Sequence, residues 1–143
     1  MLAMKTPMTQ PGLESMDNLK VLVIDDDKTT CNLLETALQL ENFQTASVSK
    51  IANGDMVALL NQQSPHFLIL DFHLNGEEAL KYIVAIRSSP RWQTLPIIIT
   101  SAIDRRRDCL DAGANEFVLK PFNWQEIIDS INRVRDQITE QEV

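Results

Sequence analysis

Polar side chains follow four short apolar runs of this sequence, and together they could handle a phosphoryl group. The runs end, in chain order, in Asp25 and Asp26, in Asp71, in the hydroxyl pair Thr100 and Ser101, and in Lys120. Clustered carboxylates with an open coordination sphere suit Mg²⁺, and a carboxylate beside a metal can attack phosphorus. A hydroxyl and an ammonium would then bind the phosphoryl oxygens. A single Asp after a strand often only caps a helix or forms a turn, but capping does not explain all four positions.

The apolar runs are continuous, as in strands that are buried on both faces of a sheet. We predict five strands, at residues 21–25, 43–48, 66–71, 95–101 and 116–120. Apolar residues at helical spacing predict five helices, at 28–40, 55–61, 76–88, 104–112 and 124–138. This alternation predicts an α/β fold with a five-stranded parallel, doubly wound sheet and helices on both faces. Ligands of such folds bind beyond the carboxyl ends of the strands, where the polar residues fall.

The length of 143 residues fits one domain with short tails. We interpret residues 1–18 as a flexible arm, residues 19–138 as the folded domain and residues 139–143 as a tail. The N-terminus lacks the apolar region of a signal peptide, and no run is long enough to span a membrane. The cysteines Cys31 and Cys109 lack a metal-binding spacing, so we interpret them as reduced packing residues of a cytoplasmic protein.

The charge balance excludes two classes of partner. Twenty acidic residues against 13 Lys and Arg give a formal net charge of −7. Non-specific binding to nucleic acid depends on clustered basic residues that contact phosphates, and anionic membranes also attract basic segments. We therefore expect neither nucleic acid nor a membrane surface as a partner.

Five stretches, in this order, resemble the receiver domain of two-component response regulators. They are VLVIDDD at 21–27, FLILD at 67–71, LPIIITSA at 95–102, AGANEF at 112–117 and LKPF at 119–122. The resemblance covers residues 19–138 and implies a single flavodoxin-like domain. It implies that Asp25 and Asp26 bind Mg²⁺ and that Asp71 accepts the phosphoryl group and also binds the metal.

The resemblance assigns further roles around the acceptor. The backbone carbonyl of His73 would complete the metal site, Lys120 would pair with the phosphoryl oxygens, and the bond before Pro121 would be cis. Phe117 matches an aromatic switch residue. Counting from Pro96 favours Ser101 as the hydroxyl that binds the phosphoryl group, but Thr100 stays a candidate. Adjacent strand residues point to opposite faces, so only one of the two can face the phosphate.

Two loops depart from the receiver pattern. The segment after Asp71 brings Gly76 within five residues and lacks the usual proline, so it is about three residues short. The segment between Ser101 and Gly113 is about one helical turn short. Because of these departures, we keep as an alternative a receiver-like interaction module that is not regulated by phosphorylation. Residues 25–29 also fit the D-x-D-x-T signature of haloacid-dehalogenase-type phosphatases, but no acidic strand residue follows Lys120, so we rank that alternative lower.

The resemblance implies a stand-alone, CheY-like response regulator and not an enzyme in the ordinary sense. A sensor histidine kinase or a histidine phosphotransfer protein would supply the phosphoryl group, with Mg²⁺ as cofactor. Phosphorylation would change the positions of Ser101 and Phe117 and alter a surface of the fourth helix, fifth strand and last helix. That surface would bind a downstream protein, and we expect a monomer or weak dimer.

Overall fold

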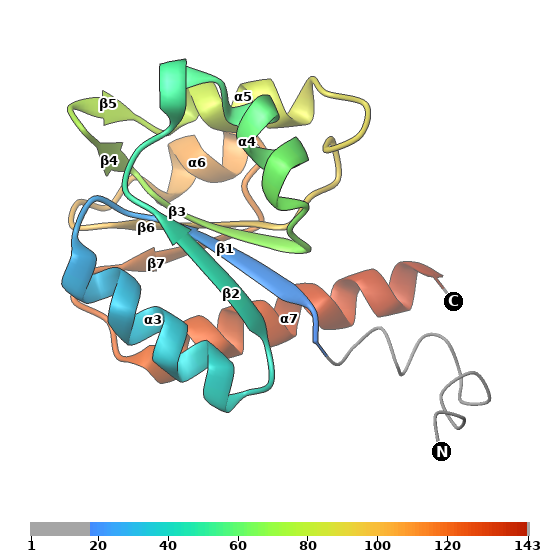
Figure 1. The fold of residues 1–143 in the computed structure, drawn as a ribbon. Helices are drawn as coiled ribbons and strands as arrows, with labels where there is room; N and C mark the ends of the chain where they lie inside the picture. The colour runs from blue at the N-terminus through green and yellow to red at the C-terminus, as the bar shows by residue number, and fades with distance from the viewer. Residues whose placement is uncertain (1–17, 143) are drawn as a thin grey trace.

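Five parallel strands form the central sheet of the computed structural model, which describes residues 18–142, with side chains through residue 137. The strand order is β2-β1-β3-β6-β7. The strands are β1 (Lys20–Ile24), β2 (Gln44–Val48), β3 (Phe67–Asp71), β6 (Ile97–Ser101) and β7 (Glu116–Leu119). All four pairings in this sheet are parallel. The predicted doubly wound sheet is confirmed (Figure 1).

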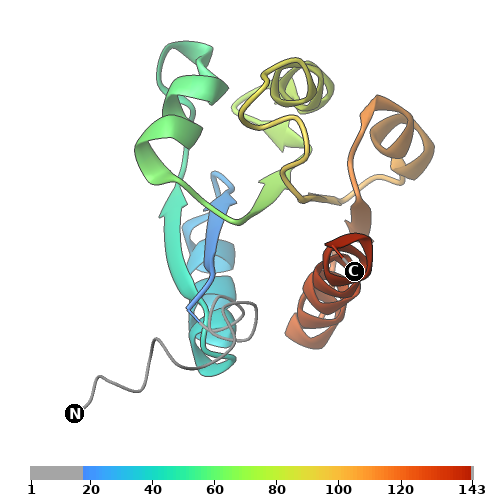
Figure 2. The same cartoon turned by 90° about the vertical axis from the view of Figure 1, so that its right-hand side faces the viewer.

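Helices cover both faces of the sheet. One face carries α3 (Lys28–Leu40) and α7 (Trp124–Glu142). The other carries the 3₁₀ turn η1 (Ala52–Gly54), α4 (Met56–Gln63), α5 (Leu80–Arg87) and α6 (Arg106–Ala112). Figure 2 shows the two layers on either side of the sheet. This arrangement follows from right-handed connections between parallel strands, which place successive helices on one face or the other according to the strand order.

Alternating residues of each strand build two separate cores. In β1, Leu22 and Ile24 pack under α4, α5 and α6, whereas Val21 and Val23 pack under α3 and α7. All four side chains are fully buried. Burial on both faces explains why the strand sequences are continuous apolar runs. It also fixes the register of the strands and therefore the positions of the residues that follow them.

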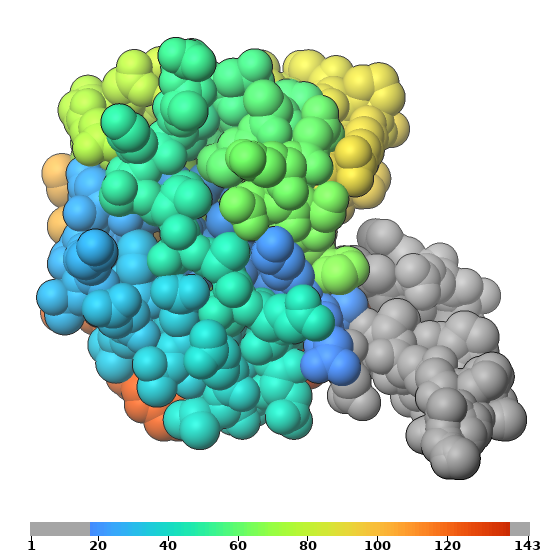
Figure 3. Space-filling model, in the orientation of Figure 1, coloured from blue at the N-terminus to red at the C-terminus, as the bar shows by residue number. Residues whose placement is uncertain are grey.

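The largest difference from the predicted elements lies after β3. Residues 76–88 were expected to form one helix, but α5 begins only at Leu80. Residues before it form an antiparallel hairpin of β4 (His73–Leu74) and β5 (Glu77–Glu78). Asn75 and Gly76 form its turn with φ angles of 51° and 84°, a conformation that Asn and Gly adopt readily. The hairpin lies at the carboxyl edge of the sheet (Figure 1) and beside the chain that follows β2 (Figure 3).

The last helix is longer than predicted. Helix α7 continues to Glu142, beyond the expected end at residue 138, because no Gly or Pro follows to end it. The predicted arm at residues 1–18 lies outside the described residues except for Asn18, whose N–H donates to the Asn42 carbonyl at 3.3 Å.

Two smaller predictions concern cysteines and membranes. Cys31 and Cys109 are free and buried, as expected of packing residues. Within residues 18–142, no helix combines the length and the apolar character that crossing a membrane requires.

Candidate functional site

Three carboxylates meet at the carboxyl edge of the sheet. Asp25 and Asp26 follow β1 directly, and Asp71 ends β3, the strand beside β1. Each offers one oxygen, and these oxygens all lie within 4.8 Å of one another. Asp25 and Asp71 are 2% and 7% exposed, whereas Asp26 is exposed. The parallel register thus brings together the acidic residues that the sequence places at two separate strand ends.

The turn between β1 and α3 fixes the orientation of Asp25. The backbone N–H of Asp27 donates to Asp25 Oδ1 at 2.9 Å. Asp27 itself caps α3, since its carboxylate accepts from the Thr29 N–H and the Thr30 hydroxyl, each at 3.0 Å. The Thr30 hydroxyl holds the pKa of Asp27 below its usual value. Asp27 is therefore a helix cap and lies outside the group of three carboxylates.

Lys120 joins the two buried carboxylates. Its ammonium lies 3.0 Å from Asp25 Oδ2 and 3.2 Å from Asp71 Oδ1. Lys120 directly follows β7, and its own N–H donates to the Ser101 carbonyl at the end of β6. The bond between Lys120 and Pro121 is cis, as the resemblance to receiver domains implies. One ammonium thus neutralises part of the charge that two buried carboxylates place at this edge.

The electrostatics of the site favour a proton or a cation near Asp71. Burial raises the pKa of Asp71 to about 6, the charge of Asp25 adds to this effect, and Lys120 opposes it. Burial alone would lower the pKa of Lys120, but the hydrogen bond to Asp25 and the charges of Asp71 and Asp25 raise it overall. Lys120 therefore stays charged, whereas the carboxylate of Asp71 is destabilised by its surroundings.

These residues fit a small divalent cation. Carboxylate oxygens are the preferred ligands of Mg²⁺, and two oxygens on one ion lie at most about 4.2 Å apart. The three oxygens lie within 4.8 Å of one another and would share an ion after moving closer together. A bound cation would also offset the repulsion that raises the pKa of Asp71. Asp25, Asp26 and Asp71 are thus a chemically suitable set of ligands for Mg²⁺.

Both candidate hydroxyls are buried at the end of β6. Thr100 and Ser101 are 2% and 1% exposed. Thr100 is the direct neighbour of Asp71 in the ladder between β3 and β6. Ser101 Oγ accepts from the Ile103 N–H at 3.1 Å. Because strand residues alternate, Thr100 shares the sheet face of α3 and α7, and Ser101 shares the face of α4, α5 and α6.

Two further residues singled out from the sequence lie near the site. His73 begins β4, where it is exposed and its ring contacts Phe72 edge to face at 4.8 Å between centroids. Phe117 lies within β7 and is 3% exposed. The guanidinium of Arg106 lies over the Phe117 ring, 5.3 Å from its centroid. Phe117 therefore occupies an inward position beneath the first turn of α6.

Sequence reasoning missed the contact between the hairpin and the acidic group. The Asn75 backbone N–H donates to Asp26 Oδ2 at 3.1 Å. The dipeptide Asn75–Gly76 is itself a strong signal for a two-residue hairpin turn. The sequence pattern instead predicts a helix that begins at Gly76, because apolar residues at helical spacing follow it. The turn signal could have located the hairpin, although not its contact with Asp26.

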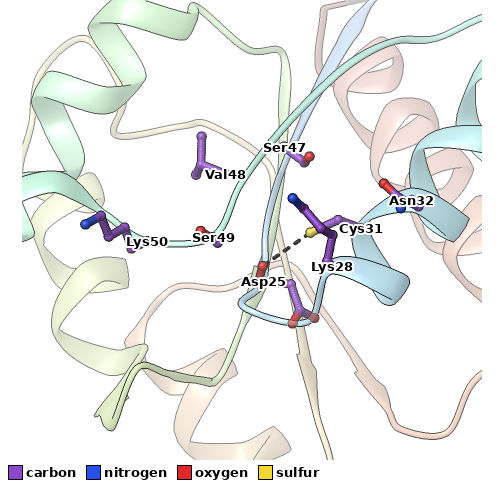
Figure 4. Close-up of a pocket in the computed structure, with 8 residues that line it drawn as sticks. All are labelled: Asp25, Lys28, Cys31, Asn32, Ser47, Val48, Ser49 and Lys50. Atoms are coloured by element: carbon purple, nitrogen blue, oxygen red, sulfur yellow. Dashed lines mark hydrogen bonds between the residues drawn. The ribbon is translucent and has the colours of Figure 1, made fainter.

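A hollow of about 380 Å³ lies between the residue that follows β1, the end of β2 and the first turns of α3. Figure 4 shows that Asp25 faces it with its backbone oxygen, which accepts from Cys31 Sγ at 3.2 Å, and turns its carboxylate away. The ammonium of Lys50 also points away from the hollow (Figure 4). The hollow is therefore a neighbour of the acidic group and shares only the backbone of Asp25 with it.

Comparison with known proteins gives one family. The model of the response regulator receiver domain matches residues 21–132. The transcriptional regulatory protein GltR of Pseudomonas aeruginosa is 33% identical over 131 residues, which cover 88% of this chain and 53% of that protein. The chain therefore spans about half the length of this curated relative.

Solved structures show the same fold at lower identity. A response regulator of Chloroflexus aurantiacus superposes with a TM-score of 0.75 at 24% identity, covering 84% of this chain and 99% of that one. A chemotaxis response regulator of Vibrio cholerae gives a TM-score of 0.68 at 20% identity, covering 81% and 98%. These two likenesses concern the fold, since both structures are less than 25% identical to this chain.

Proposed function

We propose, from the premise that this chain belongs to the response regulator receiver family of two-component systems, that Asp71 accepts a phosphoryl group in a Mg²⁺-dependent reaction. The observation that carries this proposal is the grouping of Asp71 with Asp25 and Asp26, together with the Lys120 ammonium that contacts both Asp25 and Asp71. The donor is a phosphohistidine of a sensor histidine kinase or of a phosphotransfer protein.

In the transfer, a carboxylate oxygen of Asp71 attacks the phosphorus of the donor. A bond forms between that oxygen and phosphorus, and the phosphorus–nitrogen bond breaks, leaving its electron pair on the donor imidazole, which takes up a proton. Mg²⁺, when bound, offsets negative charge on the transferring group. Asp25 and Asp26 would hold the metal together with Asp71 and the backbone carbonyl of His73.

Lys120 stabilises the negative charge of the phosphoryl oxygens during the transfer. Its ammonium lies 3.2 Å from Asp71 Oδ1, so it can bind a phosphoryl oxygen once the acyl phosphate has formed. A hydroxyl at the end of β6 binds a second oxygen, and we assign this role to Ser101. Movement of Ser101 then couples to Phe117 and to the surface of α6, β7 and α7, where a downstream protein binds.

The protein is a phosphoacceptor that promotes its own phosphorylation and dephosphorylation, and it is not an enzyme with a separate substrate. The alternative is an interaction module that binds a partner without phosphorylation, which the short segment after Asp71 favours. Stand-alone action stays a prediction, because the aligned relative extends beyond the part that this chain covers.

The deciding experiment compares the wild type with Asp71→Asn and Asp71→Ala in the presence of Mg²⁺ and acetyl phosphate. We expect a phosphorylated species by phosphate-affinity electrophoresis only for the wild type. Beryllofluoride with Mg²⁺ should shift amide NMR signals of α6, β7 and α7 in the wild type but not in Asp71→Ala. A wild type that neither reacts nor shifts would support the interaction module instead.

A further inference from the structure

The hairpin turn reaches the acidic group from outside the main sheet. The Asn75 backbone N–H donates to Asp26 Oδ2 at 3.1 Å, and the Asn75 side-chain amide donates to the Ser49 carbonyl at 3.1 Å. Asp26 follows β1 and Ser49 follows β2. A single residue therefore connects the turn to the ends of two neighbouring strands, in the region where the hairpin lies beside the chain after β2 (Figure 3).

The first strand of the hairpin is anchored in the core. Leu74 is 3% exposed and belongs to the core under α4, α5 and α6. Its partner across the hairpin, Glu77, accepts from the Tyr82 hydroxyl at 2.6 Å and pairs with the Lys81 ammonium at 2.9 Å. These contacts tie the hairpin to α5, so the position of its turn is determined by the core.

The second strand of the hairpin is held by the loop before α6. Glu78 pairs with Arg105 at 3.2 Å, and the Arg105 guanidinium lies over the Phe72 ring, 4.6 Å from its centroid. Phe72 is fully buried, and its N–H donates to the Thr100 carbonyl at 2.8 Å. The turn is thus supported from both sides and can hold another side chain in place.

Asp26 is the member of the acidic group that needs such support. Asp25 is fixed by Asp27 and Lys120, and Asp71 lies within β3 and contacts Lys120. Asp26 is exposed, and the Asn75 N–H is the one hydrogen-bond donor to its carboxylate among the described residues. When an exposed carboxylate becomes ordered only on binding a cation, the entropy cost of that ordering lowers the affinity for the cation.

We propose that Asn75 is a positioning residue for metal binding, which acts by holding the carboxylate of Asp26 toward Asp25 and Asp71. The side-chain amide on Ser49 fixes the turn, and the backbone N–H occupies Asp26 Oδ2. The other oxygen, Oδ1, has no hydrogen-bond partner among the described residues, so it is available to bind the cation. This inference rests on the proposed function, because it takes Asp26 to be a Mg²⁺ ligand.

Asparagine meets two requirements at this position. The φ angle of 51° is one that Asn and Gly tolerate far better than other residues. Glycine would keep the backbone conformation but lacks the amide that donates to Ser49. Asn75→Gly therefore removes the anchor without straining the turn, which makes it a clean test of the side chain.

The test is titration of the metal-free protein with MgCl₂ by isothermal titration calorimetry. Partners that orient a metal ligand typically change metal affinity by about ten- to a hundredfold, so we expect Asn75→Gly to raise the Mg²⁺ Kd by about tenfold. The amide of residue 75 should also exchange with solvent faster in this variant. Asn42→Gly is the matched control, because Asn42 also has a positive φ, 71°, but lies in the turn before β2.

The melting temperature in EDTA separates positioning from a general loss of structure. We expect both glycine variants to stay folded in EDTA at the temperature of the titration, and Asn42→Gly to keep the wild-type Kd. Equal Kd values for the wild type and Asn75→Gly would overturn the inference alone. A melting transition of Asn75→Gly in EDTA that overlaps the temperature of the titration would also overturn it, in favour of a structural role. A wild type that binds no Mg²⁺ would overturn the proposed function and this inference together.

Discussion

The ammonium of Lys120 lies 3.2 Å from the carboxylate of Asp71, although 49 residues and the strand β6 separate them. The same ammonium lies 3.0 Å from Asp25, which follows β1. One cation therefore connects the ends of β1, β3 and β7. Because Lys120 balances two buried carboxylates with a single charge, the site keeps an excess of negative charge, and this excess has measurable consequences.

The first consequence is a pH-dependent loss of stability. The pKa of Asp71 is about 6 in the folded protein, against 3.8 for an ordinary aspartate, so the folded state binds more protons than the unfolded state between these values. The free energy of unfolding should therefore fall as pH rises from about 4 to about 7, by about 2–3 kcal/mol from this group. Urea unfolding in EDTA at several pH values measures it.

Asp71→Asn isolates the contribution of Asp71 from those of other titrating groups. The amide carries no charge at any of these pH values, so the variant should be more stable than the wild type at pH 7 and lose this advantage near pH 4. A difference between the two proteins that stays the same across this range would contradict the raised pKa of Asp71.

The strand ends could be predicted from sequence because burial on both faces makes each strand a continuous apolar run. Asp71 is identified in this way, since four apolar residues precede it and all are buried. The contact of Lys120 with Asp25 could not be predicted in the same way. It depends on the strand order and on the path of the chain after β7, and residue spacing in one sequence contains neither.

In the hairpin, a short turn signal in the sequence competes with a longer helical pattern. Asn75–Gly76 favours a turn, but the apolar spacing of residues 79–86 favours a helix. The helix does form, although it starts at Leu80. The tertiary contacts of Leu74 and Glu78 decide the outcome, and these were not accessible from periodicity.

Removal of the ammonium should destabilise the protein at neutral pH. Lys120→Gln leaves Asp25 and Asp71 without their shared cation, and breaking a buried ion pair costs about 3 kcal/mol or more. The loss should be smaller near pH 4.5, where Asp71 is protonated in the fold. Lys81→Gln is the control, since Lys81 pairs with Glu77 on the exposed surface and such pairs contribute at most about 1 kcal/mol. Equal losses in both variants would contradict the role of Lys120.

Mg²⁺ should stabilise the folded wild type at pH 7. At about ten times its Kd, a ligand that binds only the folded state adds about 1.4 kcal/mol to the free energy of unfolding. Asp25→Asn removes a ligand and should abolish the gain, whereas Asp136→Asn, on the exposed face of α7, should keep it. Thermal unfolding with and without MgCl₂ at constant ionic strength measures the effect. Stabilisation of all three proteins alike would indicate a general salt effect.

The two hydroxyls at the end of β6 can be assigned by paired substitutions. Resemblance to receivers favours Ser101, whereas the strand register places Thr100 directly beside Asp71. A hydrogen bond to a charged group contributes about 1.5–3 kcal/mol. If Ser101 donates to the phosphoryl oxygen in the transition state, Ser101→Ala should slow phosphorylation by acetyl phosphate about ten- to a hundredfold.

Thr100→Val removes the other hydroxyl while keeping the shape of a buried side chain. It should leave the rate within about twofold of the wild type, since it removes no contact to the phosphoryl group. Urea unfolding of both variants shows whether a slow reaction reflects lost structure. A slow Thr100→Val beside a normal Ser101→Ala would assign the role to Thr100. That result would place the phosphoryl oxygen on the sheet face of α3 and α7, because adjacent strand residues point to opposite faces.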